Sequence, residues 1–280
     1  MHSIKSVLAA AANALASSSD SAALDAEILL GLTLDKERSH LRAWPDKQLE
    51  SDQINAFLSL VQRRQQGTPI AYITGSREFW SRDFHVTPDV LIPRPDTELL
   101  IELSLKLIPK DKTVKIIDLG TGSGIIAITL AAECPSAEVS AADFSLPALR
   151  IAQLNAGKHN VSRINFYHSD WFTNIPVSQF SLIVSNPPYI AEDDSHLQQG
   201  DVRFEPQTAL RAAEQGLGDI RIIAGAARSY LEHGGHLLIE HGYNQQQQVQ
   251  AIFQDFHYDN VQTYTDLSGQ PRVTYGQWHQ

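Results

Sequence analysis

The chain has 280 residues, of which 42% are hydrophobic and 19% are charged, a composition typical of a globular protein with a sizeable core. Its 32 acidic and 22 basic side chains give a net charge of -10, which argues against nucleic acid as a partner. The single cysteine, Cys134, excludes an internal disulfide bond and favours a reducing compartment such as the cytoplasm. No apolar run reaches the roughly 18 residues of a membrane span, so we expect no membrane partner.

Residues 1–66 predict a small helical domain. Residues 6–19 resemble the apolar part of a secretory signal peptide, but their modest hydrophobicity and helical spacing favour an amphipathic helix. Polar residues at 19–20 and 51–52 predict the starts of two further helices. The apolar residues that define the first predicted helix are Ile4, Val7, Leu8, Ala11 and Leu15.

Residues 67–93 differ in character from the helical region. The stretches "IAYITG", "REFWSRDFHV" and "VLIP" are aromatic and β-branched, and turn residues separate them. Such segments are typical of strands, so this part of the chain predicts a β-hairpin linker between two domains.

Residues 94–280 predict the second domain, which belongs to the α/β class. From Lys115 onward, strand-like and helix-like segments alternate, which indicates a mostly parallel sheet with helices on both faces. In such sheets, ligands bind at the carboxyl ends of the strands, near the point where the strand order reverses. We therefore expect the chemistry of this protein just after its strands.

A glycine-rich turn follows the first of these strands. The stretch "DLGTGSG", residues 118–124, opens a helix, whose free N–H groups favour ligand binding. Its spacing matches neither a Walker phosphate loop nor a dinucleotide fingerprint. Asp143 closes the next strand, where a carboxylate accepts the hydroxyls of a ribose, and Trp171 follows the third, where an adenine would lie or where an aromatic ring would join the core. We predict a nucleoside-type cofactor on Gly120, Thr121, Gly122, Ser123 and Gly124.

The sequence Asn186-Pro187-Pro188-Tyr189 follows the fourth predicted strand. Two consecutive prolines cannot continue a strand and fix the backbone in a stiff, extended turn. Together, the glycine loop, Asp143 and this turn resemble the S-adenosylmethionine-dependent methyltransferases that act on a planar nitrogen. The resemblance implies that the side-chain oxygen of Asn186 and the main-chain oxygen of Pro187 hold the two N–H groups of that nitrogen, and that Tyr189 stacks on the flat substrate.

Three further stretches narrow the resemblance to one family. "PIAYITGSREFW", "VLIPRPDTE" and "FEPQTAL" resemble the peptide chain release factor N5-glutamine methyltransferases, as does the layout of the whole chain. The resemblance implies a seven-stranded methyltransferase sheet, S-adenosylmethionine as cofactor, and a release-factor glutamine in a Gly-Gly-Gln loop as substrate. It also implies that Gly120 to Gly124 hold the methionine part of the cofactor, Asp143 its ribose and Trp171 its adenine side, with Asn186 close by. The helical domain would then bind the rest of the release factor.

Other residues leave two interpretations open. Arg94 and Asp96 either shape the pocket entrance or form a surface ion pair, and Glu205 either braces the Asn186–Tyr189 turn or belongs to a plain loop. The stretch "HGGH", residues 233–236, lacks further ligands, so we expect no metal. Two other functions remain as alternatives: a methyltransferase of exocyclic amines in nucleic acids, and a binding module without catalysis. We expect a monomer.

Overall fold

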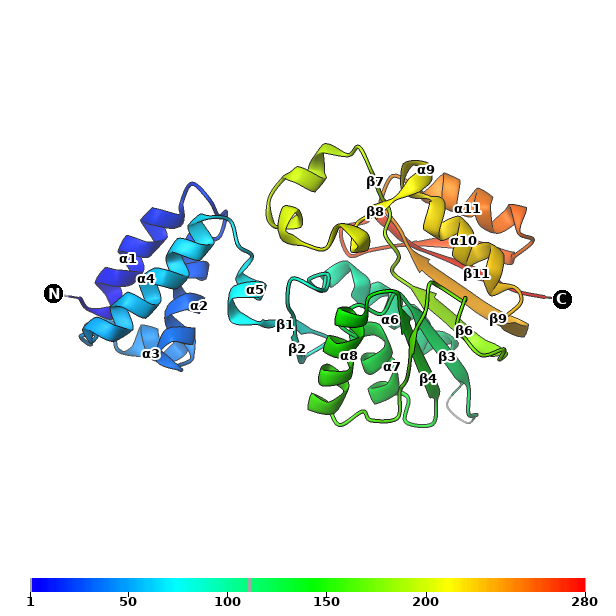
Figure 1. Cartoon of the computed structure of the whole chain (residues 1–280), viewed down its shortest axis with the longest axis horizontal. Helices are drawn as coiled ribbons and strands as arrows, with labels where there is room; N and C mark the ends of the chain where they lie inside the picture. Colours follow the sequence, from blue (N-terminus) through cyan, green and yellow to red (C-terminus); the bar gives the residue numbers. More distant parts are fainter. Residues whose placement is uncertain (1, 110–111, 280) are drawn as a thin grey trace. The chain divides into compact units, whose positions relative to one another are not determined.

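The computed structural model describes residues 2–109 and 112–279. It divides into two compact units, Met1–Ser76 with Gln199–Phe204, and Arg77–Gln198 with Glu205–Gln280. Figure 1 shows the elements of both units. Within the described ranges, no helix combines the length and the apolar character needed to cross a membrane.

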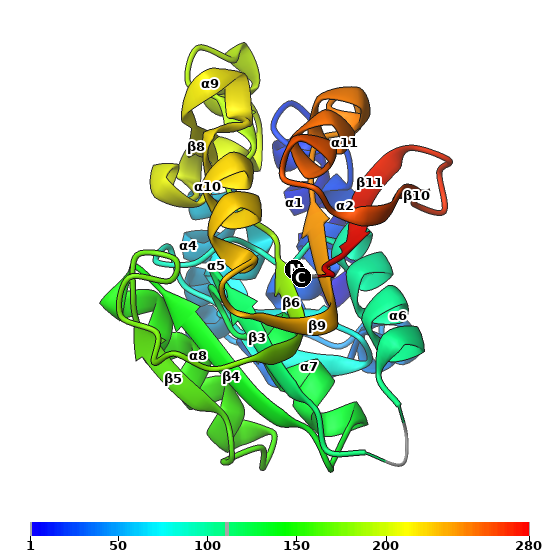
Figure 2. The same cartoon turned by 90° about the vertical axis from the view of Figure 1, so that its right-hand side faces the viewer.

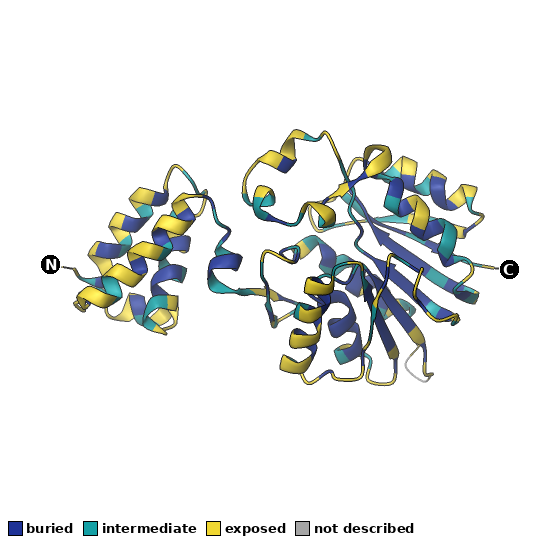
Figure 3. Ribbon diagram, in the orientation of Figure 1, coloured by how far each residue is buried: buried dark blue, intermediate teal, exposed yellow. Residues whose placement is uncertain are grey.

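The first unit is helical, as its sequence predicts. Apolar residues recur on one side of its helices and form one core, which includes Ile4, Leu30 and Phe57. Figure 3 shows this pattern as buried and exposed sides of the same helices. The helices of this unit are α1 (Ile4–Leu15), α2 (Ala22–Leu34), α3 (Arg38–Ala43), α4 (Ser51–Gln65) and α5 (Ile70–Thr74).

Two helix starts differ from the prediction by one or two residues. α2 begins after Ser21 rather than after the pair at 19–20, and the hydroxyls of Ser19 and Ser21 donate hydrogen bonds to Asp25. α4 begins after Glu50, which forms a reciprocal capping box with Gln53. In both places a carboxylate near the first turn, rather than a hydroxyl alone, organises the end of the helix.

The region of the expected linker contains both a helix and a hairpin. Ile70–Thr74, for which the aromatic and β-branched residues predict a strand, is the short helix α5. It begins after Pro69 and ends at Gly75, whose φ of 71° suits the left-handed conformation that closes a helix. The two-stranded sheet lies just beyond, in β1 (Ser76–Phe79) and β2 (Arg82–His85).

A seven-stranded sheet is the centre of the second unit, which confirms the predicted fold class. The strand order is β10-β11-β9-β6-β3-β4-β5; neighbours from β9 to β5 are parallel, and β11 runs antiparallel to β9 and β10. Its strands are β3 (Lys115–Leu119), β4 (Glu138–Asp143), β5 (Asn165–His168), β6 (Phe180–Ser185), β9 (Leu231–Glu240), β10 (Asp259–Thr265) and β11 (Pro271–Gln277).

Alternating side chains of the strands bury both faces of this sheet. Ile116 and Val184 face one core, together with apolar residues of α6 and α7, whereas Ile117 and Ile183 face the other, with α10 and α11. Figure 2 shows α10 and α11 on the opposite side of the sheet from α7. The covering helices are α6 (Glu98–Leu107), α7 (Ile125–Glu133), α8 (Leu146–Lys158), α10 (Gly218–Ala227) and α11 (Gln246–Asp255).

Short elements connect the larger ones. β7 (Ile190–Ala191) pairs in parallel with β8 (Arg211–Ala212) just after the Asn-Pro-Pro-Tyr turn. The other short segments are the 3-10 helices η1 (Pro95–Thr97), η2 (Ser195–Gln198), η3 (Asp201–Phe204) and η4 (Gln207–Ala209), and α9 (Ala213–Gly216).

A buried ion pair organises the helical unit. The Arg64 guanidinium donates from Nε to Oδ2 of Asp25 at 2.8 Å and from Nη1 to Oδ1 of Asp201 at 3.0 Å. Arg64 and Asp25 are 8% and 4% exposed, so neither charge is well solvated if its partner is lost. The pair therefore ties α2 and α4 to the segment Gln199–Phe204 inside this unit.

We predict that Arg64→Leu lowers the free energy of unfolding of the helical unit by about 3 kcal/mol, because it leaves the Asp25 carboxylate buried without its cation. Arg63→Leu, at the exposed neighbouring position, is the matched control and should change stability by less than about 0.5 kcal/mol. Hydrogen exchange of the α2 and α4 amides measures both effects. Equal protection in the two variants would contradict a stabilising role for the ion pair.

Candidate active site

The candidate site lies where the strand order of the sheet reverses. β3 and β6 are parallel neighbours, and their paired residues Leu119 and Ser185 are the last of each strand. From β3, the chain continues through β4 and β5 to one edge of the sheet. From β6, it continues through β9 toward the opposite edge. The glycine loop and the Asn-Pro-Pro-Tyr turn therefore start side by side, at the place where α/β sheets bind ligands.

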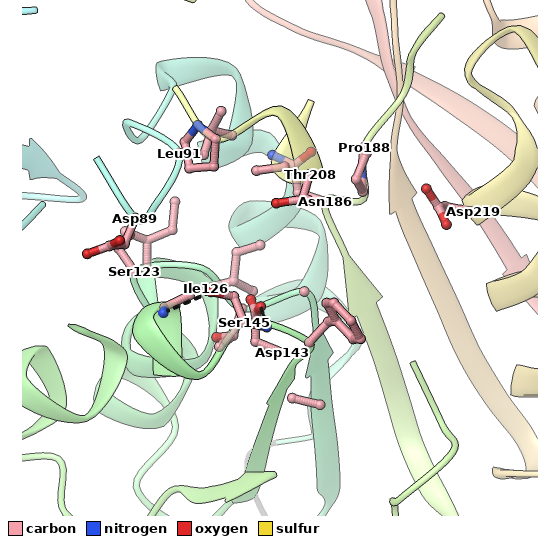
Figure 4. Close-up of a pocket in the computed structure, with 18 of the residues that line it drawn as sticks. Asp89, Leu91, Ser123, Ile126, Asp143, Ser145, Asn186, Pro188, Thr208 and Asp219 are labelled. Carbon is pink, nitrogen blue, oxygen red and sulfur yellow. Dashed lines mark hydrogen bonds between the residues drawn. The ribbon is translucent and has the colours of Figure 1, made fainter. Parts of the chain in front are cut away.

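One pocket joins these segments (Figure 4). Residues from the start of the second unit, from the glycine loop, from the ends of β4 and β5, and from the turn after β6 surround the same hollow. Seven residues predicted for the site line it: Gly120, Thr121, Ser123, Asp143, Trp171, Asn186 and Pro188. Gly122, Gly124, Pro187 and Tyr189 are not among its lining residues.

The glycine loop has a shape that side chains would disturb. A Cβ atom on Gly120 would lie 3.4 Å from the Trp171 ring, and Gly120 has a φ of 73°. A Cβ atom on Gly124 would lie 2.7 Å from Cδ1 of Ile128, and this residue has a φ of 86° at the start of α7. Both positions therefore require glycine, Gly120 at the pocket wall and Gly124 for close packing beneath the loop.

The Asp143 carboxylate fastens the glycine loop to the end of β4. Its Oδ2 accepts from the Gly122 N–H and its Oδ1 accepts from the Ser145 N–H, both at 2.8 Å. Burial raises the pKa of Asp143, and these two hydrogen bonds oppose that shift. Because each carboxylate oxygen has a second lone pair, Asp143 keeps acceptor capacity toward the pocket that it lines.

Asp118 supports the same loop from inside the protein. Its Oδ2 accepts from the Thr121 hydroxyl at 2.6 Å and from the Ala127 N–H at 3.2 Å, whereas Oδ1 has no hydrogen-bond partner among the described residues. Burial is the main reason that the pKa of Asp118 rises to about 7. The charge of this carboxyl is therefore sensitive to pH close to neutrality.

Trp171 lies at the pocket wall and also contacts the core. The ring lines the pocket beneath Gly120 and also packs against the core cluster that contains Phe172. Its backbone φ is 45°, a strained value for a bulky residue. Burial raises the pKa of Asp219, a lining residue on α10, and its interaction with the Trp171 side chain opposes that shift. Asp219 belongs to no recognised sequence motif. Only its position near the start of a helix could have indicated that it lines the pocket.

Asn186 projects from the end of β6 into the pocket (Figure 4). Its Nδ2 donates to Oγ1 of Thr97 at 3.2 Å, and Thr97 is almost fully buried at the end of η1. Thr97 lines the pocket but has no place among the residues predicted for the site. It lies in "IPRPDTE", so the resemblance marked its segment but not its role.

Tyr189 is partly buried and is not among the residues that line the pocket. Its ring packs against the core cluster on the α10 and α11 face, and burial raises the pKa of its hydroxyl. Its carbonyl accepts from Nε2 of Gln245 at 3.0 Å, and Gly216 approaches the same carbonyl closely. These contacts fix the far end of the turn, and the stacking of Tyr189 on a substrate stays a prediction.

Arg94, Asp96 and Glu205 form ion pairs beside the pocket. Glu205 is 3% exposed and accepts from the Ile92 N–H at 3.1 Å and from the guanidinium of Arg94, which lines the pocket. Asp96 pairs with Arg272 at 3.1 Å. Glu205 thus joins "FEPQTAL" to "VLIPRPDTE", and the two stretches together form one side of the pocket wall.

The histidines at 233 and 236 lie away from this pocket. His236 forms a hydrogen bond with the Tyr275 hydroxyl at 3.1 Å, and the His233 ring packs near that of His279. Across residues 2–109 and 112–279, no group of three or more His, Cys, Asp and Glu side chains is arranged to hold a metal ion.

Solved structures with the same fold are methyltransferases. A methyltransferase from Pyrococcus furiosus superposes with a TM-score of 0.56 at 13% identity, over 78% of this chain and 98% of that chain. A 16S rRNA methyltransferase from T. thermophilus, in complex with AdoMet and guanosine, gives a TM-score of 0.54 at 19% identity, over 73% of this chain and 50% of that chain. The chain therefore has the methyltransferase fold, with its pocket at the switch point of the sheet.

Family models and sequence relatives identify the particular family. Residues 6–75 match the PrmC N-terminal domain, and residues 96–214 match the methyltransferase small domain. A release factor glutamine methyltransferase of Shewanella oneidensis is 47% identical, over 94% of this chain and 92% of its own length. That of Coxiella burnetii is 45% identical, over 98% of each chain, and that of Escherichia coli is 46% identical, over 94% of each. The chain belongs to the release factor glutamine methyltransferase family.

We predict that Asp118 makes stability depend on pH below neutrality. A carboxyl in the unfolded chain titrates near pH 4, so between about pH 4 and 7 the folded state keeps a proton that the unfolded state has lost. The contribution of Asp118 to the free energy of unfolding therefore falls as pH rises through this window. Asp118→Asn keeps an oxygen for the Thr121 hydroxyl and removes the titration. Its stability relative to wild type should rise by roughly 1.4 kcal/mol per pH unit in urea titrations; parallel curves would contradict this.

Proposed function

We propose that this chain transfers a methyl group from S-adenosylmethionine to the side-chain amide nitrogen, N5, of the glutamine in the Gly-Gly-Gln motif of peptide chain release factors. The observation that carries the proposal is the junction of the glycine loop and the Asn-Pro-Pro-Tyr turn at paired strand ends. This junction brings a nucleoside-type cofactor site next to acceptors for a planar amide. The identity with named release factor glutamine methyltransferases, over nearly the whole chain, supports the substrate.

The lining residues fit S-adenosylmethionine chemically. When bound, this cofactor supplies an electrophilic methyl carbon on a positively charged sulfur. Gly120 presents a wall without a side chain, Asp143 offers acceptors for a ribose diol, and Trp171 offers an aromatic face beside Asp170 for an adenine. We propose that Gly120 to Gly124 hold the methionine part of the cofactor, with Gly122 and Gly124 acting through the shape of the loop.

Asn186 and the prolines after it would hold the glutamine. An amide nitrogen is a weak nucleophile because its lone pair is delocalised into the carbonyl. Two acceptors, the Asn186 side-chain oxygen and the Pro187 main-chain oxygen, would hold both N–H groups and orient the nitrogen for transfer. The two prolines donate no N–H group, and β6 and the β7–β8 pair fix the chain on either side of the turn. A rigid site of this kind orients the amide without a metal or a covalent intermediate.

The partner of the site is a protein in this proposal. A glutamine at the tip of an exposed loop can enter the pocket while the rest of the release factor binds elsewhere. We assign that binding to the N-terminal helical domain, residues 1–66. The linker then comprises residues 67–93, and the methyltransferase domain comprises residues 94–280. The net charge of -10 does not favour a nucleic-acid substrate.

We predict that the chain, supplied with methyl-labelled S-adenosylmethionine, labels a release factor but not its Gly-Gly-Gln variant in which the glutamine is replaced by alanine. RNA and DNA, offered separately, should remain unlabelled. Mass spectrometry of the labelled peptide then locates the methyl group on the glutamine side chain. Label on nucleic acid, or equal label on the variant without the glutamine, would overturn the proposed substrate.

We predict that Asn186→Ala lowers kcat by about 10² to 10³, because it removes one of two acceptors that orient the amide. The dissociation constant of S-adenosylmethionine, measured by calorimetry, should change little. Asn165→Ala, at an exposed position at the start of β5, is the matched control and should retain wild-type turnover. Normal turnover by Asn186→Ala would exclude the double-acceptor mechanism.

A further inference from the structure

The register of the sheet places a buried carboxyl group next to Asn186. In the parallel pair of β6 and β9, Ser185 lies opposite Ile239. The next residue on each strand is therefore Asn186 on one side and Glu240 on the other, both at the carboxyl edge of the sheet. Glu240 is 1% exposed and is not among the lining residues of the pocket, whereas Asn186 is.

The Glu240 carboxyl belongs to a small polar network behind the pocket wall. Interactions with the side chains of Thr97 and Asn186 lower the pKa of Glu240 against the larger, raising effect of burial. Asn186 donates from Nδ2 to Oγ1 of Thr97 at 3.2 Å. Oε2 of Glu240 is buried and has no hydrogen-bond partner in the described part of the chain. The charged groups around this network are Asp96 and Arg272, which pair with each other at 3.1 Å.

An asparagine side chain can present either its oxygen or its NH₂ group, and the two ends differ little in shape. The Thr97 hydroxyl cannot decide between them, because a hydroxyl both donates and accepts. In its ionised form the Glu240 carboxyl only accepts, so it then favours the arrangement in which the Thr97 hydroxyl donates to it and accepts from Asn186. The NH₂ group of Asn186 is then held toward this network, and its oxygen is left for the pocket.

We propose that Glu240, acting with Thr97, is the positioning residue that sets the orientation of the Asn186 amide and so presents its oxygen to the substrate. The inference rests on the proposed function, in which Asn186 accepts a hydrogen bond from the glutamine amide. A flipped Asn186 would present NH₂ to the substrate NH₂, which leaves two donors facing each other and no acceptor. A buried acidic residue without a solvent contact is costly, and this role gives a reason for its presence at the strand end.

The test uses variants that change the acceptor without changing side-chain size. Glu240→Met removes the carboxyl acceptor, and Thr97→Val removes the hydroxyl. Each variant should lower kcat by about 10²-fold. The dissociation constant of S-adenosylmethionine should stay within a few-fold of the wild-type value. Glu240→Gln keeps one carbonyl oxygen and should lose much less activity. Thr97→Ser keeps the hydroxyl and should restore turnover. Thr129→Val, at a buried threonine of α7 outside the pocket, is the control and should behave as wild type.

Double variants separate positioning from a merely structural contribution. If Glu240 acts through Asn186, adding Glu240→Met to Asn186→Ala should cause no further loss of kcat, and adding it to Thr97→Val should cause little. Losses of kcat that multiply in these double variants would overturn the positioning role, as would wild-type turnover in Glu240→Met. If the wild-type chain still labels the glutamine in these experiments, the proposed function stands. If Glu240→Met does not fold, the difference in kcat between Thr97→Val and Thr97→Ser tests the positioning role in its place. A wild-type chain that labels no glutamine overturns the proposed function itself, and this inference with it.

Discussion

The parallel pairing of β3 with β6 is the constraint on which the site depends. Because Leu119 and Ser185 are paired at the ends of these strands, the glycine loop and Asn186 begin at the same height on the sheet. The chain then leaves toward α7 on one face and toward β7 on the other side of the pocket, so a hollow remains between them. A shift of one residue in this register would separate the cofactor loop from the amide acceptor.

Buried carboxyl groups are concentrated at this edge of the sheet. Asp118, Asp143 and Glu240 lie at or next to the last residues of β3, β4 and β9, and burial raises the pKa of all three. Each has a different set of partners: Asp118 braces the glycine loop from within, Asp143 accepts from the loop and faces the pocket, and Glu240 lies behind Asn186. Such groups reduce stability at neutral pH, and their concentration at one edge is typical of a functional site.

Ion pairs give the pocket its second wall. Glu205 is buried, and its hydrogen bond with the Ile92 N–H joins two segments that are far apart in sequence. Arg272, which lies on β11, forms ion pairs with Asp96 and Asp266. A surface ion pair would add little, but a carboxylate as buried as that of Glu205 is costly unless it is paired. These contacts explain why the stretches around Ile92 and Glu205, which are far apart in sequence, lie at one site.

The pattern of residues predicted a mostly parallel sheet with helices on both faces and seven of the residues that line the pocket, because strand periodicity and glycine or proline turns are local signals. It was wrong for Ile70–Thr74, whose β-branched and aromatic residues form a helix between Pro69 and Gly75. Those two flanking residues are local signals for the ends of a helix. The packing of Tyr189 against the core, in contrast, depends on residues far away in the sequence, such as Gln245.

By itself, the sequence determined the α/β class, the glycine loop, Asp143 and the stiff turn at Asn186, since each depends on the chemistry of adjacent residues. Only the tertiary structure decided that Thr97 and Asp219 line the pocket and that Glu240 lies beside Asn186, because strand order and register bring together residues separated by as much as half of the chain. The orientation of the Asn186 amide belongs to this second group. A side chain with two nearly equivalent ends takes its direction from neighbours that no local pattern names.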